Sequence, residues 1–215
     1  MQVAPPEELE AFVASNPDIE MLEVLMPDMN GIFRCKRIHR SEFPALFKGS
    51  LKAVASQPLV TTMGEYSEQI DPALVAGEPD KKLLPIVGSL VTVPWLASPT
   101  GQVMASLGEL EGGPAWVDPR NVLAGVLKRF TDIGLRPTVA TEMEFYLVAP
   151  GEGVVPQPLL GAIPGTGMQQ QGIQYAMAED LWEHDAFLND VRIACELQGV
   201  PLTTVHCEFA PGQWE

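Results

Sequence analysis

The sequence predicts an α+β protein. Segments with helical spacing of apolar residues alternate along the chain with segments in which apolar and polar residues alternate, as they do in strands. The chain also contains 19 glycines and 20 prolines among its 215 residues, whereas these two residues together usually make up roughly 12% of a sequence. This excess argues against an all-helical bundle and favours many turns and strands. The apolar fraction of 46% excludes a wholly disordered chain.

The chain begins with a predicted helix and hairpin. The apolar spacing over residues 7–14 predicts a short helix. Residues 21–38 are expected to form a strand, a turn and a second strand, because Asn30 and Gly31 tolerate the positive φ that a tight turn requires.

A second short helix is expected over residues 41–48, with Ser41 as its N-terminal cap. Residues 53–80 are expected to be irregular, because glycines and prolines interrupt them repeatedly. Two short strands are then predicted, over residues 90–95 and 102–110.

The composition shifts at a Glu-Gly-Gly-Pro stretch, residues 111–114, where we place a domain boundary. This gives an N-terminal domain of residues 1–113 and a second domain of residues 114–215. The second domain opens with a helix that is capped by Asp118 and ends at Gly134.

The remaining elements alternate between strand and helix. Residues 138–148 predict a strong strand, and residues 150–172 are too rich in glycine, proline and glutamine to pack, which predicts a surface loop. Residues 180–198 predict an amphipathic helix, and residues 203–209 predict a second strand.

Two glutamates in the first of these strands point to the same side. Side chains alternate along a strand, so Glu142 and Glu144 share one face, and Met143 and Phe145 are expected to be buried behind it. Two carboxylates roughly 7 Å apart repel each other in a low dielectric. A cation beside them would remove the repulsion, although a solvated strand face would also explain the pair.

Two further glutamates are expected to converge on one site. Glu208 lies on the second strand, Pro211 and Gly212 break that strand, and Glu215 follows on the next extended segment. Glutamate oxygens without histidine or thiolate ligands suit Mg²⁺ or Mn²⁺ better than Zn²⁺, and these ions commonly hold phosphate groups during phosphoryl transfer. Since the sequence has no Walker-type glycine-rich loop, any nucleotide would be held by other means.

The net charge of −15 disfavours nucleic acid as a partner, because phosphate binding requires clustered Lys and Arg. The basic stretch over residues 34–40 is interpreted as a solvated hairpin face. No apolar run approaches the ~20 residues of a membrane span, and the acidic N-terminus does not resemble a signal peptide, so we expect a cytoplasmic protein. The three cysteines lack CxxC spacing, and Cys207 is expected to be a small core residue.

Several motifs of this chain together resemble those of the glutamine synthetase family. Their residues are most similar to those of its γ-glutamylpolyamine (γ-glutamylputrescine) synthetase branch. The resemblance extends from about Glu20 to Glu215. The stretches that carry it are Asp28 to Arg37, Gly77 to Pro85, Val93-Pro94-Trp95, Asp118-Pro119-Arg120, Gly134-Leu135, Glu142 to Leu147, and Glu208 to Glu215.

The resemblance implies an N-terminal β-grasp domain followed by the first part of an α+β catalytic domain. It implies a ligase that uses ATP to phosphorylate the γ-carboxylate of glutamate, after which ammonia or an amine displaces the phosphate. It further implies two Mg²⁺ or Mn²⁺ ions at sites between the subunits of a ring-shaped homo-oligomer. By motif match, Glu144, Glu208 and Glu215 would hold the ion near glutamate, and Glu142 would hold the ion near the ATP phosphates.

The chain departs from the family in two respects. Family members are about twice as long, so this chain resembles an N-terminal portion that lacks most nucleotide contacts. The family's amine-binding Asp is absent where this chain has Met63 to Ser67, and Glu65 or Glu68 would have to replace it. A non-catalytic structural or regulatory relative therefore remains an alternative, as does an Mg²⁺-dependent hydrolase of unrelated fold.

Overall fold

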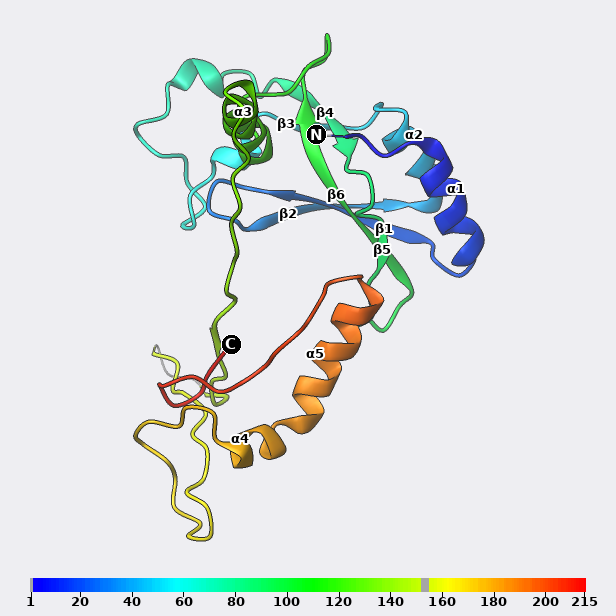
Figure 1. The fold of residues 1–215 in the computed structure, drawn as a ribbon. Coiled ribbons are helices and arrows are strands. Elements are labelled where there is room, and N and C mark those ends of the chain that lie inside the picture. Colours follow the sequence, from blue (N-terminus) through cyan, green and yellow to red (C-terminus); the bar gives the residue numbers. More distant parts are fainter. Residues whose placement is uncertain (1, 152–154) are drawn as a thin grey trace. The chain divides into compact units, whose positions relative to one another are not determined.

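The computed structural model describes residues 2–151 and 155–215. It divides into two compact units, Met1–Pro137 and Thr138–Glu215, which are described separately (Figure 1). Residues 152–154 of the predicted surface loop lie outside the described residues. None of the described helices is long and apolar enough to cross a membrane.

A mixed sheet with the strand order β2-β1-β6-β4-β3 organises the first unit, and β5 pairs with β6. β1 and β6 are parallel, whereas the other pairs are antiparallel. This part of the fold is therefore α+β, as predicted. The strands are β1 (Met21–Pro27), β2 (Phe33–His39), β3 (Lys52–Val54), β4 (Asp80–Pro85), β5 (Val91–Thr92) and β6 (Thr100–Gly108).

The predicted hairpin is confirmed. β1 and β2 pair from Met21↔His39 to Pro27↔Phe33, and Gly31 in the turn has φ 78°, a value that glycine adopts without a steric penalty. The side chain of Asp28 is buried inside the turn and accepts hydrogen bonds from the backbone N–H groups of Asn30 and Ile32.

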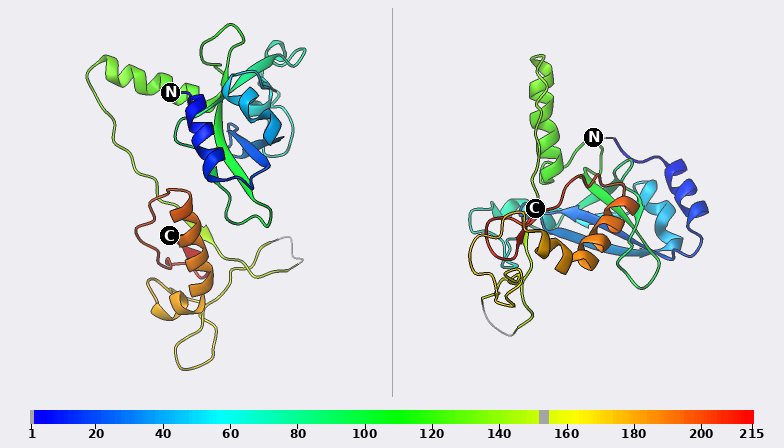
Figure 2. Two further views of the ribbon diagram at one scale, coloured as in Figure 1. Left: turned by 90° about the vertical axis from the view of Figure 1, so that its right-hand side faces the viewer. Right: turned by 60° about the horizontal axis from the view of Figure 1, so that its bottom comes forward.

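Helices α1 (Pro6–Ser15) and α2 (Phe43–Phe47) contact each other and add apolar side chains to the core under the sheet (Figures 1 and 2). Leu22 and Leu83 of the strands and Leu46 of α2 are fully buried there. The prediction that Ser41 caps this helix is wrong. A 3-10 turn over Arg40–Glu42 precedes α2, which starts at Phe43 without a side-chain cap. Three 3-10 turns lie among residues 2–137: η1 (Arg40–Glu42), η2 (Gln57–Leu59) and η3 (Pro72–Leu74).

Helix α3 (Pro119–Asp132) is attached to the sheet at its N-terminus. Its predicted cap, Asp118, accepts hydrogen bonds from the backbone N–H groups of Arg120 and of Leu107 in β6. This attachment to β6 places α3 in the first unit, which ends at Pro137, although the far end of α3 projects away from the sheet (Figure 2). The boundary predicted between residues 113 and 114 rests on a shift in composition rather than on spatial contacts, and it stays a prediction. The apolar side chains of α3 are exposed: Val122, Leu123, Val126, Leu127, Phe130 and Ile133.

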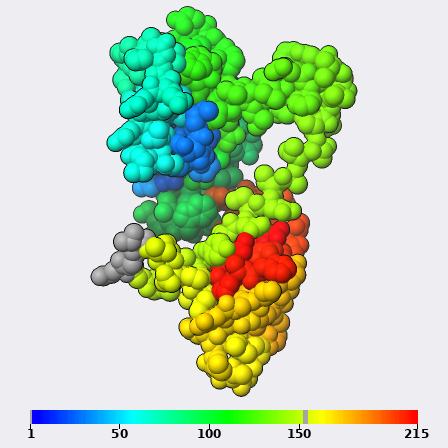
Figure 3. All heavy atoms as spheres, turned by 90° about the vertical axis from the view of Figure 1, so that its left-hand side faces the viewer, coloured from blue at the N-terminus to red at the C-terminus, as the bar shows by residue number. Residues whose placement is uncertain are grey.

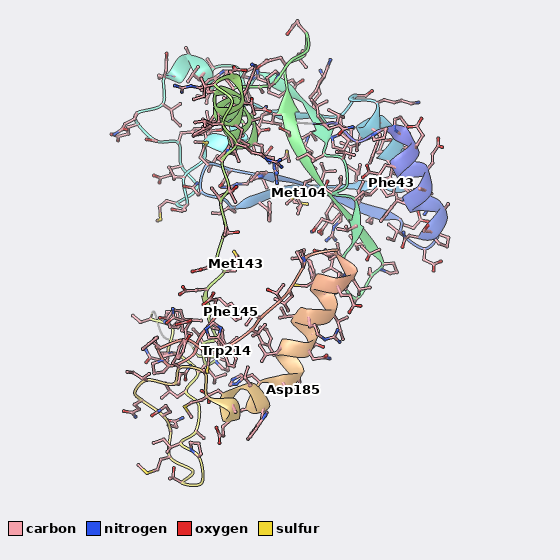
Figure 4. The ribbon with its side chains drawn as sticks, in the orientation of Figure 1. Phe43, Met104, Met143, Phe145, Asp185 and Trp214 are labelled. Atoms are coloured by element: carbon pink, nitrogen blue, oxygen red, sulfur yellow. The ribbon has the colours of Figure 1, made fainter. Side chains whose placement is uncertain are left out.

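The described residues of the second unit form two helices and a short two-stranded sheet around a small core. Cys207 and Trp214 are buried at its centre, which confirms the core assignment of Cys207. Trp214 pairs with Phe145 across the sheet, and the two side chains lie close together in Figure 4. The elements are α4 (Ala178–Glu183), α5 (Asp185–Leu197), β7 (Phe145–Tyr146) and β8 (Gln213–Trp214).

Two strand predictions in this unit are largely wrong. Only residues 145–146 of the predicted strand 138–148 form a strand, and residues 203–209 contribute only the isolated bridge Cys207↔Trp214. Met143 is 77% exposed and Phe145 is 37% exposed, so the expected buried face behind the glutamates is absent (Figure 4). The physical reason is pairing: within the described residues, segment 138–144 has no neighbouring strand to complete a ladder.

Asp180 is a buried acid in the core of the second unit. Its side chain is 1% exposed, and neither carboxylate oxygen has a hydrogen-bond partner among the described residues. The carboxylate packs on the α-carbon of Gly161, where an added Cβ would lie 1.9 Å from Oδ1. Burial raises the pKa of Asp180, and the charges of Glu183 and Glu179 raise it further, whereas His184 lowers it.

We expect Asp180→Asn to raise the thermal unfolding midpoint at pH 7 but to change it little near pH 4. A carboxyl whose pKa is raised by folding binds more protons in the folded state than in the unfolded state, so its contribution to stability is lost as the pH rises above 3.8. Thermal unfolding of both proteins at the two pH values measures the effect. An equal shift at both pH values would contradict it.

Candidate metal site

A short loop brings the ends of segment 206–215 together. The backbone N–H of His206 donates to the carbonyl of Glu215, and the N–H of Glu215 donates back to the carbonyl of His206, both at 3.0 Å. The N–H of Glu208 donates to the carbonyl of Gln213 at 2.8 Å. The turn closes at Gly212, whose φ is 77°. This backbone pairing holds residues 206, 208 and 215 next to one another, so that their side chains are close together.

His206, Glu208 and Glu215 form a cluster that could hold a metal ion. The Nε2 atom of His206 lies 2.9 Å from Oε1 of Glu208 and 3.6 Å from Oε2 of Glu215. One ligand atom from each residue lies within 4.8 Å of the other two, and all three residues are half-buried. The predicted convergence of Glu208 and Glu215 is therefore present in the structure. The C-terminal segment that carries them, red in Figure 3, is accessible on the face shown.

The electrostatics of this cluster favour a cation. A hydrogen bond with Glu208 raises the pKa of Glu215, and burial and the charge of Glu142 raise it further, whereas His206 lowers it. Closely spaced carboxylates resist ionising together. A divalent ion between Glu208 and Glu215 would remove this repulsion.

The other two predicted ligands lie close to the cluster but outside it. Glu144 is exposed, and its Oε2 accepts a hydrogen bond from Nε2 of Gln213 at 2.6 Å. The carbonyl of Gln213 accepts the hydrogen bond from the N–H of Glu208, so Gln213 links Glu144 to the cluster. Glu142 is also exposed, and its charge acts on Glu215. The structure thus brings Glu208 and Glu215 together and leaves the roles of Glu142 and Glu144 as predictions.

The weaker candidates, Glu65 and Glu68, lie exposed on a loop of the first unit. The backbone of Glu65 pairs with Thr61, whose N–H donates to the Glu65 carbonyl at 2.8 Å. Their proposed part in amine binding stays a prediction.

The expectation of a ligand set without histidine is wrong, because His206 lies in the cluster. The two carboxylates suit Mg²⁺ or Mn²⁺, and the imidazole, as a nitrogen donor, favours the transition ion Mn²⁺ over Mg²⁺. Sequence reasoning missed His206. The available signal was its spacing: His206 precedes Glu208 by two residues, which places both side chains on one face of an extended segment.

Comparisons with known proteins identify the second part of the chain. Residues 116–215 match the family described as glutamine synthetase, catalytic domain. The chain is 33% identical over 214 residues to the gamma-glutamylputrescine synthetase PuuA of Escherichia coli, covering 97% of this chain and 44% of that protein. It is 30% identical over 183 residues to a glutamine synthetase of Mycobacterium tuberculosis, covering 78% of this chain and 38% of that protein.

Solved structures show the same fold. A GmaS/ADP complex superimposes with a TM-score of 0.70 at 19% identity, covering 96% of this chain and 43% of that chain. GmaS without ligand superimposes with a TM-score of 0.69. The chain spans less than half the length of these relatives and solved structures. The glutamate motifs, the fold and the family match agree, and the chain belongs to the glutamine synthetase family.

Proposed function

We propose that this chain is part of an ATP-dependent ligase that joins ammonia or an amine to the γ-carboxylate of glutamate. In this reaction the γ-phosphoryl group of ATP passes to the γ-carboxylate, which gives γ-glutamyl phosphate and ADP. The amine nitrogen then attacks the acyl carbon, phosphate leaves with the bonding electrons, and the nitrogen loses a proton. The names of two relatives, a gamma-glutamylputrescine synthetase and a glutamate–isopropylamine ligase from Pseudomonas, support an amine larger than ammonia.

The observation that carries this proposal is the convergence of Glu208 and Glu215 within one cluster of ligand atoms. An ion bound there would supply positive charge that neutralises the phosphate and carboxylate groups brought together in the reaction. We propose that Glu144 completes the set for the ion near glutamate, which its link to Gln213 supports. Glu142 would belong to a second ion near the ATP phosphates.

The first unit has a proposed role in assembly. Its mixed sheet, with a parallel β1–β6 pair at the centre, is consistent with a β-grasp domain, and the family match that begins at residue 116 supports a boundary near 113/114. In a ring-shaped homo-oligomer, Glu65 or Glu68 from one subunit would meet the incoming amine at the site of the next. Sedimentation velocity of the protein tests this assembly, and a monomer at all concentrations would argue against it.

We expect the 215-residue chain alone to bind Mn²⁺ but to form no γ-glutamyl amide. The described residues cluster ligands for one ion, and the chain spans less than half the length of its ligase relatives. The measurement is ADP release and product formation with glutamate, ATP and a panel of amines that includes ammonia, isopropylamine and putrescine. Amide synthesis by this chain alone would contradict the prediction, whereas synthesis by a longer gene product would support the ligase.

A second candidate is a non-catalytic relative that keeps the fold for a structural or regulatory role. The departure at Met63 to Ser67 favours it, because no Asp stands where the family binds its amine. The same assay separates the two. A longer gene product that binds ATP and Mn²⁺ but releases no ADP with any amine would favour the non-catalytic role.

A further inference from the structure

We propose that His206 is a nitrogen ligand of the ion held by Glu208 and Glu215, and that it makes this site select Mn²⁺ over Mg²⁺. The inference rests on the metal site of the proposed function and adds to it a residue that determines which ion binds. The glutamates alone would treat the two ions more alike, because both accept carboxylate oxygens.

The first support is the direction of the imidazole. The same atom, Nε2, lies 2.9 Å from a Glu208 oxygen and 3.6 Å from a Glu215 oxygen, so one edge of the ring meets both carboxylates. An ion between the carboxylates would lie on the side to which Nε2 points. A neutral imidazole carries its available lone pair on one nitrogen, and Nε2 is the nitrogen that the geometry presents.

The second support is that the ring is held in place before any ion binds. The backbone of His206 is fixed by the reciprocal pair of hydrogen bonds with Glu215. The ring of Tyr175 meets the imidazole edge to face, with centroids 5.4 Å apart at 89°, and Tyr175 packs in turn on Phe209 at 4.8 Å. The side chain of His206 is only 24% exposed. A ligand that is already oriented loses little conformational entropy on binding.

The chemical consequence is selectivity. Imidazole nitrogen suits first-row transition ions, whereas Mg²⁺ prefers oxygen ligands and water. A site with two carboxylates and one imidazole should therefore bind Mn²⁺ more tightly than Mg²⁺, and removal of the imidazole should lower the affinity for Mn²⁺ selectively.

The chain contains a matched control. His39 and Glu20 in the first unit also form a His–Glu pair, with Nε2 at 3.6 Å from Oε2, but both side chains are about 60% exposed, at 61% and 60%. The metal-ligand cluster found among the described residues does not include them. His39→Asn therefore removes a histidine beside a glutamate without touching the proposed site.

The test measures Mn²⁺ and Mg²⁺ binding by calorimetry, and Mn²⁺–nitrogen coupling by pulsed electron paramagnetic resonance, on the 215-residue chain. Wild type and His39→Asn should show a coupling typical of a directly bound imidazole nitrogen, and His206→Asn should not. Removal of outer-shell partners already costs about 10- to 100-fold in metal affinity, so His206→Asn should weaken Mn²⁺ binding by at least ~10-fold. The affinity for Mg²⁺ should change by less than about threefold.

A second variant guards against simple misfolding. His206→Gln offers an amide oxygen in place of Nε2 and should retain Mg²⁺ binding while it loses the nitrogen coupling. If Mn²⁺ binds to wild type without nitrogen coupling, and equally well to His206→Asn, the inference about His206 is overturned and the glutamate site stands. If Mn²⁺ does not bind to wild type at all, both the inference and the proposed metal site fail in this chain.

Discussion

Glu215→Gln should abolish the thermal stabilisation that Mn²⁺ gives to this protein while leaving the metal-free protein as stable as wild type, or slightly more stable. A hydrogen bond with Glu208 raises the pKa of Glu215, and burial and Glu142 raise it further. The folded state therefore disfavours the ionised carboxylate, and the contribution of Glu215 to stability falls as the pH rises above its ordinary value of 4.5. A neutral amide removes this penalty and one of the ion's ligands together.

The measurement is the thermal unfolding midpoint at pH 7 with increasing Mn²⁺. An ion that binds only the folded state raises the midpoint progressively once its concentration exceeds the dissociation constant. We expect such a rise for wild type. For Glu215→Gln we expect no rise even at Mn²⁺ concentrations about 100 times higher than those that stabilise wild type. Glu20→Gln, which removes an exposed acid beside a histidine, is the control and should behave as wild type. A Glu215→Gln protein that is less stable without metal, yet still responds to Mn²⁺, would show that Glu215 is a structural acid.

Asp28→Ala should lower the free energy of unfolding by about 3 kcal/mol, which is at the lower end of the range for breaking a buried ion pair. Asp28 accepts hydrogen bonds from Nε of Arg34 at 3.0 Å and from Nη2 at 2.7 Å, in addition to those within the turn. Its side chain is fully buried, whereas that of Arg34 is 30% exposed. Removing the carboxylate leaves the guanidinium and two backbone N–H groups without their acceptor.

This pair also determines how stability depends on pH. Burial raises the pKa of Asp28, but the hydrogen bonds from Arg34, Asn30 and Ile32 and the charge of Arg34 outweigh burial, and the pKa is lowered overall. The contribution of Asp28 is therefore present above its ordinary value of 3.8 and is lost as the pH falls further. The difference between wild type and Asp28→Asn, measured by urea unfolding, should shrink below about pH 4.

Asp80 provides the control for Asp28. Asp80 pairs with Lys52 at 3.1 Å, but the two side chains are about half exposed, and such surface pairs contribute roughly 0.2–1 kcal/mol. Asp80→Ala should therefore cost far less than Asp28→Ala. Equal losses of stability would contradict the role that we assign to the buried pair.

The sequence predicts those elements whose cause is local. The hairpin at Asn30-Gly31, the Asp118 cap and the helix stop at Gly134, which has φ 74°, are each specified by a few neighbouring residues. β4 was not predicted, because its residues alternate poorly and it is held by pairing with β3 and β6, which lie far away in the sequence. The prediction of a strand over residues 138–148 was largely wrong for the opposite reason, because most of a strong local pattern there lacks a partner. Its alternation is strong, but a strand also needs a partner. Among the described residues of this segment, 145–146 pair with a strand and Val148 forms an isolated bridge, whereas residues 138–144 have no partner strand.

The candidate site follows the same rule. Glu208 and Glu215 were predicted to converge because a Pro-Gly break lies between them, and the structure brings them together. The positions of Glu142 and Glu144 relative to that pair depend on a strand that the described residues do not complete. His206 was missed because a single histidine within a predicted strand carries little information until its ring is seen against both carboxylates.

The closed loop of residues 206–215 has a consequence for how the ion site forms. The entropy lost on bringing two points of a chain together grows with the length of chain between them, and here only a few residues separate the clustered side chains. Bringing these side chains together therefore costs less chain entropy than the distant pairings that build the sheet of the first unit. The loop pairs with β7 through β8, and it also approaches this segment at Gly212. The carbonyl of Gly212 accepts a hydrogen bond from the N–H of Leu147 at 2.8 Å, and a Cβ added to Gly212 would lie 2.9 Å from the Leu147 carbonyl oxygen. The glycine at the turn of this loop thus sets how closely the segment that carries Glu144 can approach the loop.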